Sequence, residues 1–116
     1  MNPEELRART KKFALRVISL FRALPRSPEA QVIGKQLLRS GTSVAANYRA
    51  ACRARSRAEF VARVAVVEEE ADESTLWLEL LGDSGIMKPA KLAALLAEAR
   101  ELTAIFTATR RTARQS

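Results

Sequence analysis

Apolar residues recur along four segments of the chain at alternating steps of three and four, the spacing of one face of an amphipathic helix. The first two stripes are Leu6, Thr10, Phe13, Val17, Leu20 and Leu24, and then Ile33, Leu37, Gly41, Val44, Tyr48 and Ala51. The last two are Phe60, Val64, Val67, Ala71, Ser74, Leu78 and Leu81, and then Leu92, Leu95, Ala99, Leu102 and Phe106. No segment alternates with period two, so the pattern predicts helices and no strands.

Start and stop signals bound the four segments. The predicted starts are Asn2-Pro3, Ser27-Pro28, the capping box of Ser56 with Glu59, and Lys88-Pro89, while Pro25, Gly82 and Gly85 are stop signals. Because the connections are short, neighbouring helices should run antiparallel. We therefore predict an all-α, antiparallel up-down-up-down four-helix bundle as a single domain over residues 1–108. Residues 109–116 are polar and basic, and we expect them to form a frayed C-terminal tail.

The composition narrows the class of protein. Aromatic residues are only 5% of the 116 residues, so the core must rely on Leu, Val, Ile and Ala. There is no histidine, which removes the commonest general base and the commonest metal ligand. The single cysteine, Cys52, cannot form an internal disulfide, which fits a reducing compartment. With neither a transmembrane run nor a signal peptide, we expect a cytoplasmic, membrane-independent protein that is not an enzyme and needs no cofactor or metal.

The net charge of +7 is spread unevenly, with basic residues concentrated in residues 1–66 and 102–116 and acids in residues 67–101. Rows of cations at helical spacing predict a nucleic-acid-binding surface made of Arg9, Lys12, Arg16, Arg49, Arg53, Arg57, Arg110 and Arg114. Few aromatic residues are available for stacking on bases, so binding should be driven by contacts with the nucleic-acid backbone and should be weakly sequence-specific. Alternatively, the arginines pair with the acidic run 68–73. We interpret this run as a partner of arginines and not as a metal site, because carboxylate metal sites in helix bundles also use histidine, which this chain lacks.

A second apolar stripe lies away from the predicted core. It consists of Leu15, Val61, Ala65, Leu76 and Leu80. A monomer has no use for such a stripe, so these residues predict an oligomer interface.

The stretch GTSVAANYRAA, from Gly41 to Ala51, admits three interpretations. A helix-turn-helix would need an apolar anchor where Asn47 stands, and a nucleophilic Ser43 would need a base that a chain without histidine does not readily supply. We therefore predict a packing seam of Gly41, Asn47 and Tyr48, with Gly41 allowing a facing helix to approach closely. Asn47 is expected to fix the register of the bundle by a hydrogen bond to Glu70 or Ser74.

Leu37 to Leu81 also contains motifs in a specific order: Gly-Thr-Ser-x-x-Ala-Asn-Tyr-Arg, Ser-x-x-Glu-Phe, Glu-Ala-Asp-Glu and Trp-Leu. This order, within four helices, closely resembles the four-helix-bundle family related to proteins encoded in intervening sequences of 23S ribosomal RNA genes. The resemblance implies a small bacterial protein without known catalysis that assembles as a ring of five bundles. The chain is also similar to the accessory protein of diversity-generating retroelements, which binds nucleic acid and a reverse transcriptase through basic surfaces. Many relatives place Glu where this chain has Ala50, so no role of that Glu is carried over.

The sequence thus predicts a self-assembling, non-enzymatic bundle, a homo-oligomer that binds RNA or DNA with low sequence specificity. The alternative is an oligomeric protein-binding scaffold without nucleic-acid binding.

Overall fold

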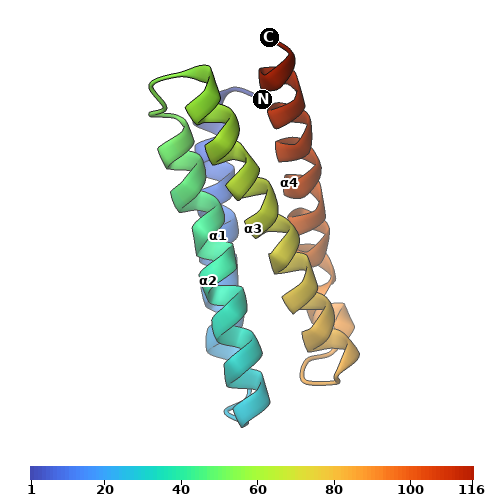
Figure 1. Ribbon diagram of the computed structural model, residues 1–116. Coiled ribbons are helices and arrows are strands. Elements are labelled where there is room, and N and C mark those ends of the chain that lie inside the picture. The colour runs from blue at the N-terminus through green and yellow to red at the C-terminus, as the bar shows by residue number, and fades with distance from the viewer.

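Four long antiparallel helices make up nearly the whole chain in the computed structural model, which describes residues 1–116 (Figure 1). They are α1 (Pro3–Ala23), α2 (Pro28–Ala51), α3 (Arg57–Asp83) and α4 (Pro89–Gln115). The bundle measures 46 × 20 × 19 Å along its principal axes. The structure contains no strand, and the predicted four-helix bundle is confirmed. None of the helices carries an apolar window that could cross a bilayer.

The capping residues act largely as the sequence indicates. The side-chain oxygen of Asn2 accepts a hydrogen bond from the backbone N–H of Glu5 at 2.8 Å, and the Glu5 carboxylate accepts from the N–H of Asn2 at 3.5 Å. At the start of α3, the Ser56 hydroxyl accepts from the N–H of Glu59 at 3.0 Å. The Glu59 carboxylate accepts from the N–H of Arg55 instead of Ser56, so only half of that predicted capping box forms.

The last helix is longer than the sequence indicated. Residues 109–115 continue α4 without a break at Thr109, and the Thr109 hydroxyl donates to the carbonyl of Ile105 at 2.8 Å. Arg110 donates to the Glu68 carboxylate of α3 at 2.6 Å. The residues expected to form a separate frayed tail are therefore the last turns of α4.

The four predicted stripes meet in one core along the bundle axis. Nearly all of their residues are buried, and Leu20, Ile33 and Phe60 are half-buried at its edge. The core includes one buried polar pair, in which the hydroxyls of Ser40 on α2 and Ser74 on α3 lie 2.9 Å apart. Each of the two hydroxyls also reaches a carbonyl of its own helix. This pair satisfies the polar groups that α2 and α3 bring into their contact.

Helices α1 and α2 approach most closely where α2 carries glycine. A Cβ atom added to Gly41 would lie 2.8 Å from Cγ2 and 3.2 Å from Cβ of Val17. One added to Gly34, one heptad earlier, would lie 2.5 Å from Cδ1 of Leu24. The prediction that Gly41 permits a close helix approach therefore agrees with the geometry, and Gly34 adds a second such contact.

The hydrogen bond expected from Asn47 to Glu70 or Ser74 does not form. The amide nitrogen of Asn47 donates to the carbonyl of Ser43 in its own helix at 2.9 Å, and the side chain is half-buried. The two partners proposed for it are engaged elsewhere, because Ser74 pairs with Ser40 and Glu70 with Arg39. The hydrogen bond that joins α2 to α3 in the core comes from Ser40 instead.

Replacing Gly41 by Ala should destabilise the bundle by about 1 kcal/mol. Alanine gains up to about 1 kcal/mol of helix propensity over glycine, but overpacking a core costs about 1–3 kcal/mol. Val17 cannot relieve the clash by rotating, because its own Cβ is one of the close atoms. Urea unfolding followed by circular dichroism measures the change.

Gly82→Ala is the matched control for this experiment. An added Cβ there would meet the flexible end of Leu92 at 3.3 Å and Pro89 at the ordinary contact distances of 3.8 and 4.0 Å, so this variant should be neutral or slightly more stable. A stabilised Gly41→Ala variant would contradict the close approach at Val17.

Candidate nucleic-acid interface

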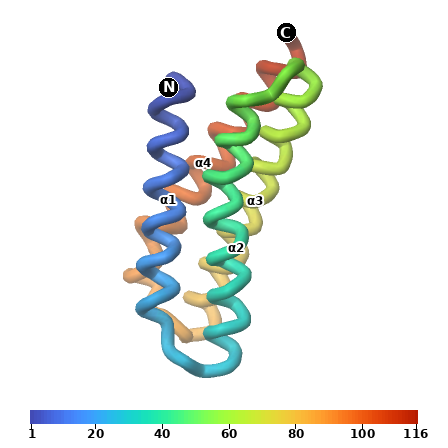
Figure 2. The backbone as a smooth tube through the Cα atoms, turned by 90° about the vertical axis from the view of Figure 1, so that its left-hand side faces the viewer, coloured from blue at the N-terminus to red at the C-terminus, as the bar shows by residue number.

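A cavity of about 790 Å³ lies between α1 and α2, near the N-terminus of α1 and the C-terminal end of α2. It is lined by Arg7, Ala8, Lys11, Thr42, Ala45, Ala46, Arg49, Cys52 and Arg53, and we call it the basic groove. The two helices lie close together near their connecting loop and diverge toward the end that holds the groove (Figure 2). The groove therefore opens beyond the last glycine contact, at Gly41.

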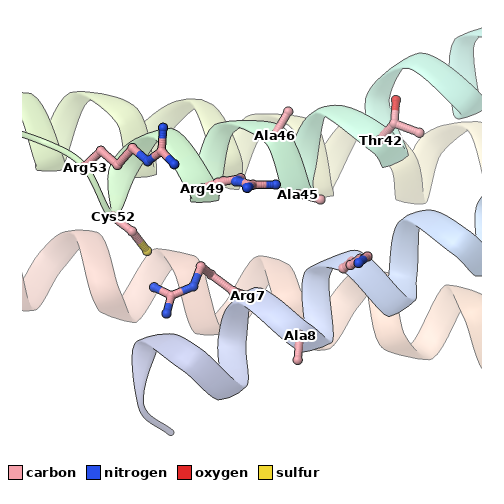
Figure 3. A pocket seen from close by; sticks show the side chains of 9 residues that line it. Arg7, Ala8, Thr42, Ala45, Ala46, Arg49, Cys52 and Arg53 are labelled. Atoms are coloured by element: carbon pink, nitrogen blue, oxygen red, sulfur yellow. The ribbon is translucent and has the colours of Figure 1, made fainter.

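Four cations surround the basic groove, two from each helix. Arg7 reaches it from α1 and Arg49 and Arg53 from α2, on either side of the gap between the helices (Figure 3). These three arginines and Lys11, the fourth cation, are all exposed, and none forms an ion pair. No carboxylate lines the groove. This arrangement leaves four positive charges free to bind an anionic ligand.

The basic groove contains two of the predicted residues and two that sequence reasoning missed. Arg49 and Arg53 were predicted, and they face Arg7 and Lys11 across the gap. Arg7 and Lys11 are four residues apart, so their helical spacing could have been recognised in the sequence. Spacing alone did not indicate which of the several basic rows on α1 faces α2.

Two of the predicted cations are engaged in ion pairs. Arg9 contacts Glu98 at 2.8 Å and Glu101 at 3.1 Å on α4, and Arg110 contacts Glu68 at 2.6 Å. The hydrogen bond from Arg9 holds the pKa of Glu98 below its usual range despite partial burial. Hydrogen bonds from Arg110 and then Thr107 lower the pKa of Glu68 in the same way. For Arg9 and Arg110, the alternative interpretation as internal partners of acids describes the structure better.

The remaining predicted cations lie outside the basic groove. Lys12 and Arg16 line a second cavity, of about 480 Å³, between α1 and α4, and we call it the α1/α4 groove. It is also lined by Leu15 and Lys91. Arg57, at the start of α3, and Arg114, near the end of α4, are exposed and form no ion pair. The structure thus places the eight predicted cations in four different environments, two in each.

Three of the five acids in the acidic run of α3 have arginine partners. Arg39 contacts Glu70 at 2.9 Å and Glu73 at 2.5 Å, and its hydrogen bond to Glu73 raises the pKa of Arg39. Glu68 is the partner of Arg110. No group of three or more His, Cys, Asp or Glu side chains is placed to hold a metal ion.

Below the basic groove, Tyr48 joins α2 to α4. Its ring lies 5.2 Å from the ring of Phe106, measured between centroids, and the side chain is buried. Burial, followed by the interaction with neighbouring Cys52, raises the pKa of Tyr48 to about 12, while the charge of Arg7 acts in the opposite direction. The aromatic pair is part of the buried core of the bundle.

Comparison with known proteins agrees with the fold and the motifs. The family model of the 23S rRNA-intervening sequence protein matches residues 5–108, so the chain belongs to this family. A crystal structure of a protein with unknown function from the S23 ribosomal protein family of Bacteroides thetaiotaomicron is similar, with a TM-score of 0.88 and 30% identity. The match covers 96% of this chain and 99% of that one. No curated protein matches the chain.

The buried phenol predicts an unusual alkaline titration. Because the pKa of Tyr48 is about 12 in the fold and about 10 in an unfolded chain, the neutral phenol favours the folded state. Its contribution is complete below about pH 10 and is lost as the pH rises toward about 12. Tyr48 is the only tyrosine, so the ultraviolet absorbance of tyrosinate reports it alone.

The same titration in urea provides the reference and should give a midpoint near pH 10, as expected for free tyrosine. Tyr48→Phe should abolish the signal. A midpoint near pH 10 in the folded protein would mean that the hydroxyl is open to water, contrary to its burial.

Proposed function

We propose that this protein self-associates and that each copy binds the phosphate backbone of RNA or DNA in its basic groove. The observation that carries the nucleic-acid part is the clustering of four unpaired cations around one cavity without a carboxylate. By contrast, Arg9, Arg39, Arg100 and Arg110 each contact an acid of α3 or α4. The acids of α3 and α4 thus neutralise arginines elsewhere and leave the α1/α2 side positive.

Binding of this kind is governed by counterion release. Each phosphate that a cation neutralises releases condensed ions, so affinity falls steeply as salt rises. No aromatic side chain lines the groove, so bases have nothing to stack on. These features support binding to the phosphate backbone of the nucleic acid, with little dependence on base sequence.

Self-association is supported by two complementary surfaces on opposite parts of the bundle. On α3, Leu76 and Leu80 are 46% and 37% exposed, with acids at positions 69, 72 and 83 on the same face. The α1/α4 groove contains Leu15, which is 55% exposed, and is rimmed by Lys12, Arg16 and Lys91. An apolar, acidic face thus fits an apolar, basic groove of a second copy.

A contact between two different surfaces is head-to-tail and generates a ring if the rotation closes. The half-buried Val61 and Ala65 extend the α3 face toward its N-terminus. Together with Leu15, Leu76 and Leu80, they form the interface that we propose. From the family resemblance we expect five copies in the ring.

The double variant Arg49→Glu and Arg53→Glu should weaken nucleic-acid binding at least tenfold at about 0.1 M salt. The plot of log affinity against log salt should become less steep by about 1.4–1.8, at about 0.7–0.9 for each lost phosphate contact. Fluorescence anisotropy of a labelled oligonucleotide across a salt series, with nuclease-treated protein, measures both quantities.

Arg26→Glu with Lys35→Glu is the charge-matched control, since both residues are exposed and neither lines the groove. Arg26 lies in the α1–α2 connection and Lys35 in the first third of α2, whereas the groove begins at Thr42 of α2. This control should keep most of the affinity and of the slope. Equal losses in both variants would indicate diffuse attraction to a basic protein. No binding by the wild type at low salt would favour the alternative function, an oligomeric protein-binding scaffold.

Head-to-tail contact predicts a specific mixing behaviour. Leu76→Glu with Leu80→Glu damages the α3 face, and Leu15→Glu damages the α1/α4 groove, so each variant alone should be monomeric. Mixed together, each retains one intact surface and the pair should form a dimer and nothing larger. Light scattering coupled to size exclusion measures the masses.

Val32→Glu is the control for these variants, because Val32 is an apolar residue that is 64% exposed on α2 and belongs to neither surface. It should assemble like the wild type. A monomeric wild type, or variants that assemble normally, would contradict the proposed interface.

A further inference from the structure

We propose that the basic groove binds a single nucleic-acid strand and discriminates against a duplex. This inference rests on the proposed function and names the form of nucleic acid that the groove accepts. It depends on the concave shape of the site as well as on its charge. The two factors make opposite predictions about strand preference, so experiment can separate them.

Charge alone would favour a duplex. The duplex carries two strands of phosphates, and each cation contact contributes a salt slope of about 0.9 on a duplex against about 0.7 on a single strand. A flat basic patch on this bundle should therefore bind a duplex at least as tightly as a single strand. A preference for the single strand requires a feature that keeps the duplex away from the cations.

The shape of the groove supplies that feature. It is a cavity of about 790 Å³ between two helices, and Ala45 and Cys52 point into the gap between its walls (Figure 3). Small side chains on the floor leave room for a narrow chain to lie between Arg7 on one wall and Arg49 and Arg53 on the other. One strand of a duplex would have to give up its base pairing and stacking to enter the groove, and this cost keeps the paired strand out.

The positions of the cations match a short extended strand. Arg7 and Lys11 are separated by four residues on α1, and Arg49 and Arg53 by four residues on α2. Four residues of helix rise about 6 Å, which places consecutive charges along each wall in line with the groove. A strand lying in the groove can thus meet cations on both sides at successive phosphates.

The groove has no neutral oxygen or nitrogen donor that is free to read a base. The Thr42 hydroxyl donates to the carbonyl of Leu38 in its own helix at 2.7 Å, and the remaining neutral side chains are Ala8, Ala45, Ala46 and Cys52. The strand should therefore lie with its phosphates inside and its bases toward solvent. Homopolymers of different bases should bind with affinities within about threefold of one another.

A competition experiment tests the strand preference. A labelled single-stranded oligonucleotide bound to the full-length protein is displaced by unlabelled single strand or by a duplex of the same length. We expect the duplex to compete at least tenfold more weakly, with a salt slope for the single strand of about −3, from four contacts at about 0.7 each. Equal or stronger competition by the duplex would overturn the inference and leave the proposed function standing, whereas absence of any binding would refute both.

A variant that fills the groove without changing its charge separates shape from electrostatics. Ala45→Leu retains all four cations but occupies the floor, so it should weaken single-strand binding about tenfold and reduce the discrimination between single strand and duplex. Ala97→Leu, at an exposed position of α4, is the matched control and should bind like the wild type. Unchanged binding by a correctly folded Ala45→Leu variant would contradict binding inside the groove.

Cys52 provides a second readout that needs no mutation. It is the only cysteine of the chain and lines the groove, so the rate at which a neutral maleimide alkylates it reports whether the groove is occupied. Saturating single strand should slow the reaction at least fivefold, and duplex at the same nucleotide concentration should not. Bound single strand that leaves the alkylation rate unchanged would show that the ligand lies elsewhere.

Discussion

The close contact between α1 and α2 is the constraint on which the rest of the bundle depends. Gly34 and Gly41 leave no room for a side chain against Leu24 and Val17. Side chains of α1 therefore pack directly against the backbone of α2 at these two glycines. Beyond Gly41, the same face of α2 carries Tyr48, whose ring packs on Phe106 of α4. The helices therefore diverge from a narrow end to a wide one, and this divergence creates the basic groove (Figure 2).

The distribution of carboxylates decides which arginines remain free. Ion pairs join α1 to α4 through Arg9, α2 to α3 through Arg39, and α3 to α4 through Arg110 and Arg100. No such pair bridges α1 and α2, where contact is made by apolar side chains and glycine. Partly exposed pairs of this kind contribute little net stability each, about 0–1 kcal/mol. Their larger effect is on the surface, because they engage arginines at the three other helix contacts and leave the cations between α1 and α2 without an acidic partner.

The sequence was sufficient for the fold because each stripe has a regular period and clear caps. It was less informative about the site, since spacing gives the rows of cations but not the direction in which each row faces. Arg49 and Arg53 were found, whereas Arg7 and Lys11 became visible only once α1 was oriented against α2. Asn47 was misjudged because a short amide can bond its own helix, as it does at Ser43. The Ser40–Ser74 pair was missed because two small hydroxyls leave almost no signal in a hydrophobic pattern.

The basic groove, on the α1/α2 side, is separate from both surfaces proposed for self-association, on α3 and between α1 and α4. Copies joined through those surfaces would each keep an open groove and repeat it at a fixed interval. A strand long enough to reach a second groove would then experience a high effective concentration of that site, with a gain in avidity of about 10²–10⁴. Under this arrangement the assembly would respond to strand length, with weak retention of short fragments and strong retention of strands that exceed the distance between neighbouring grooves.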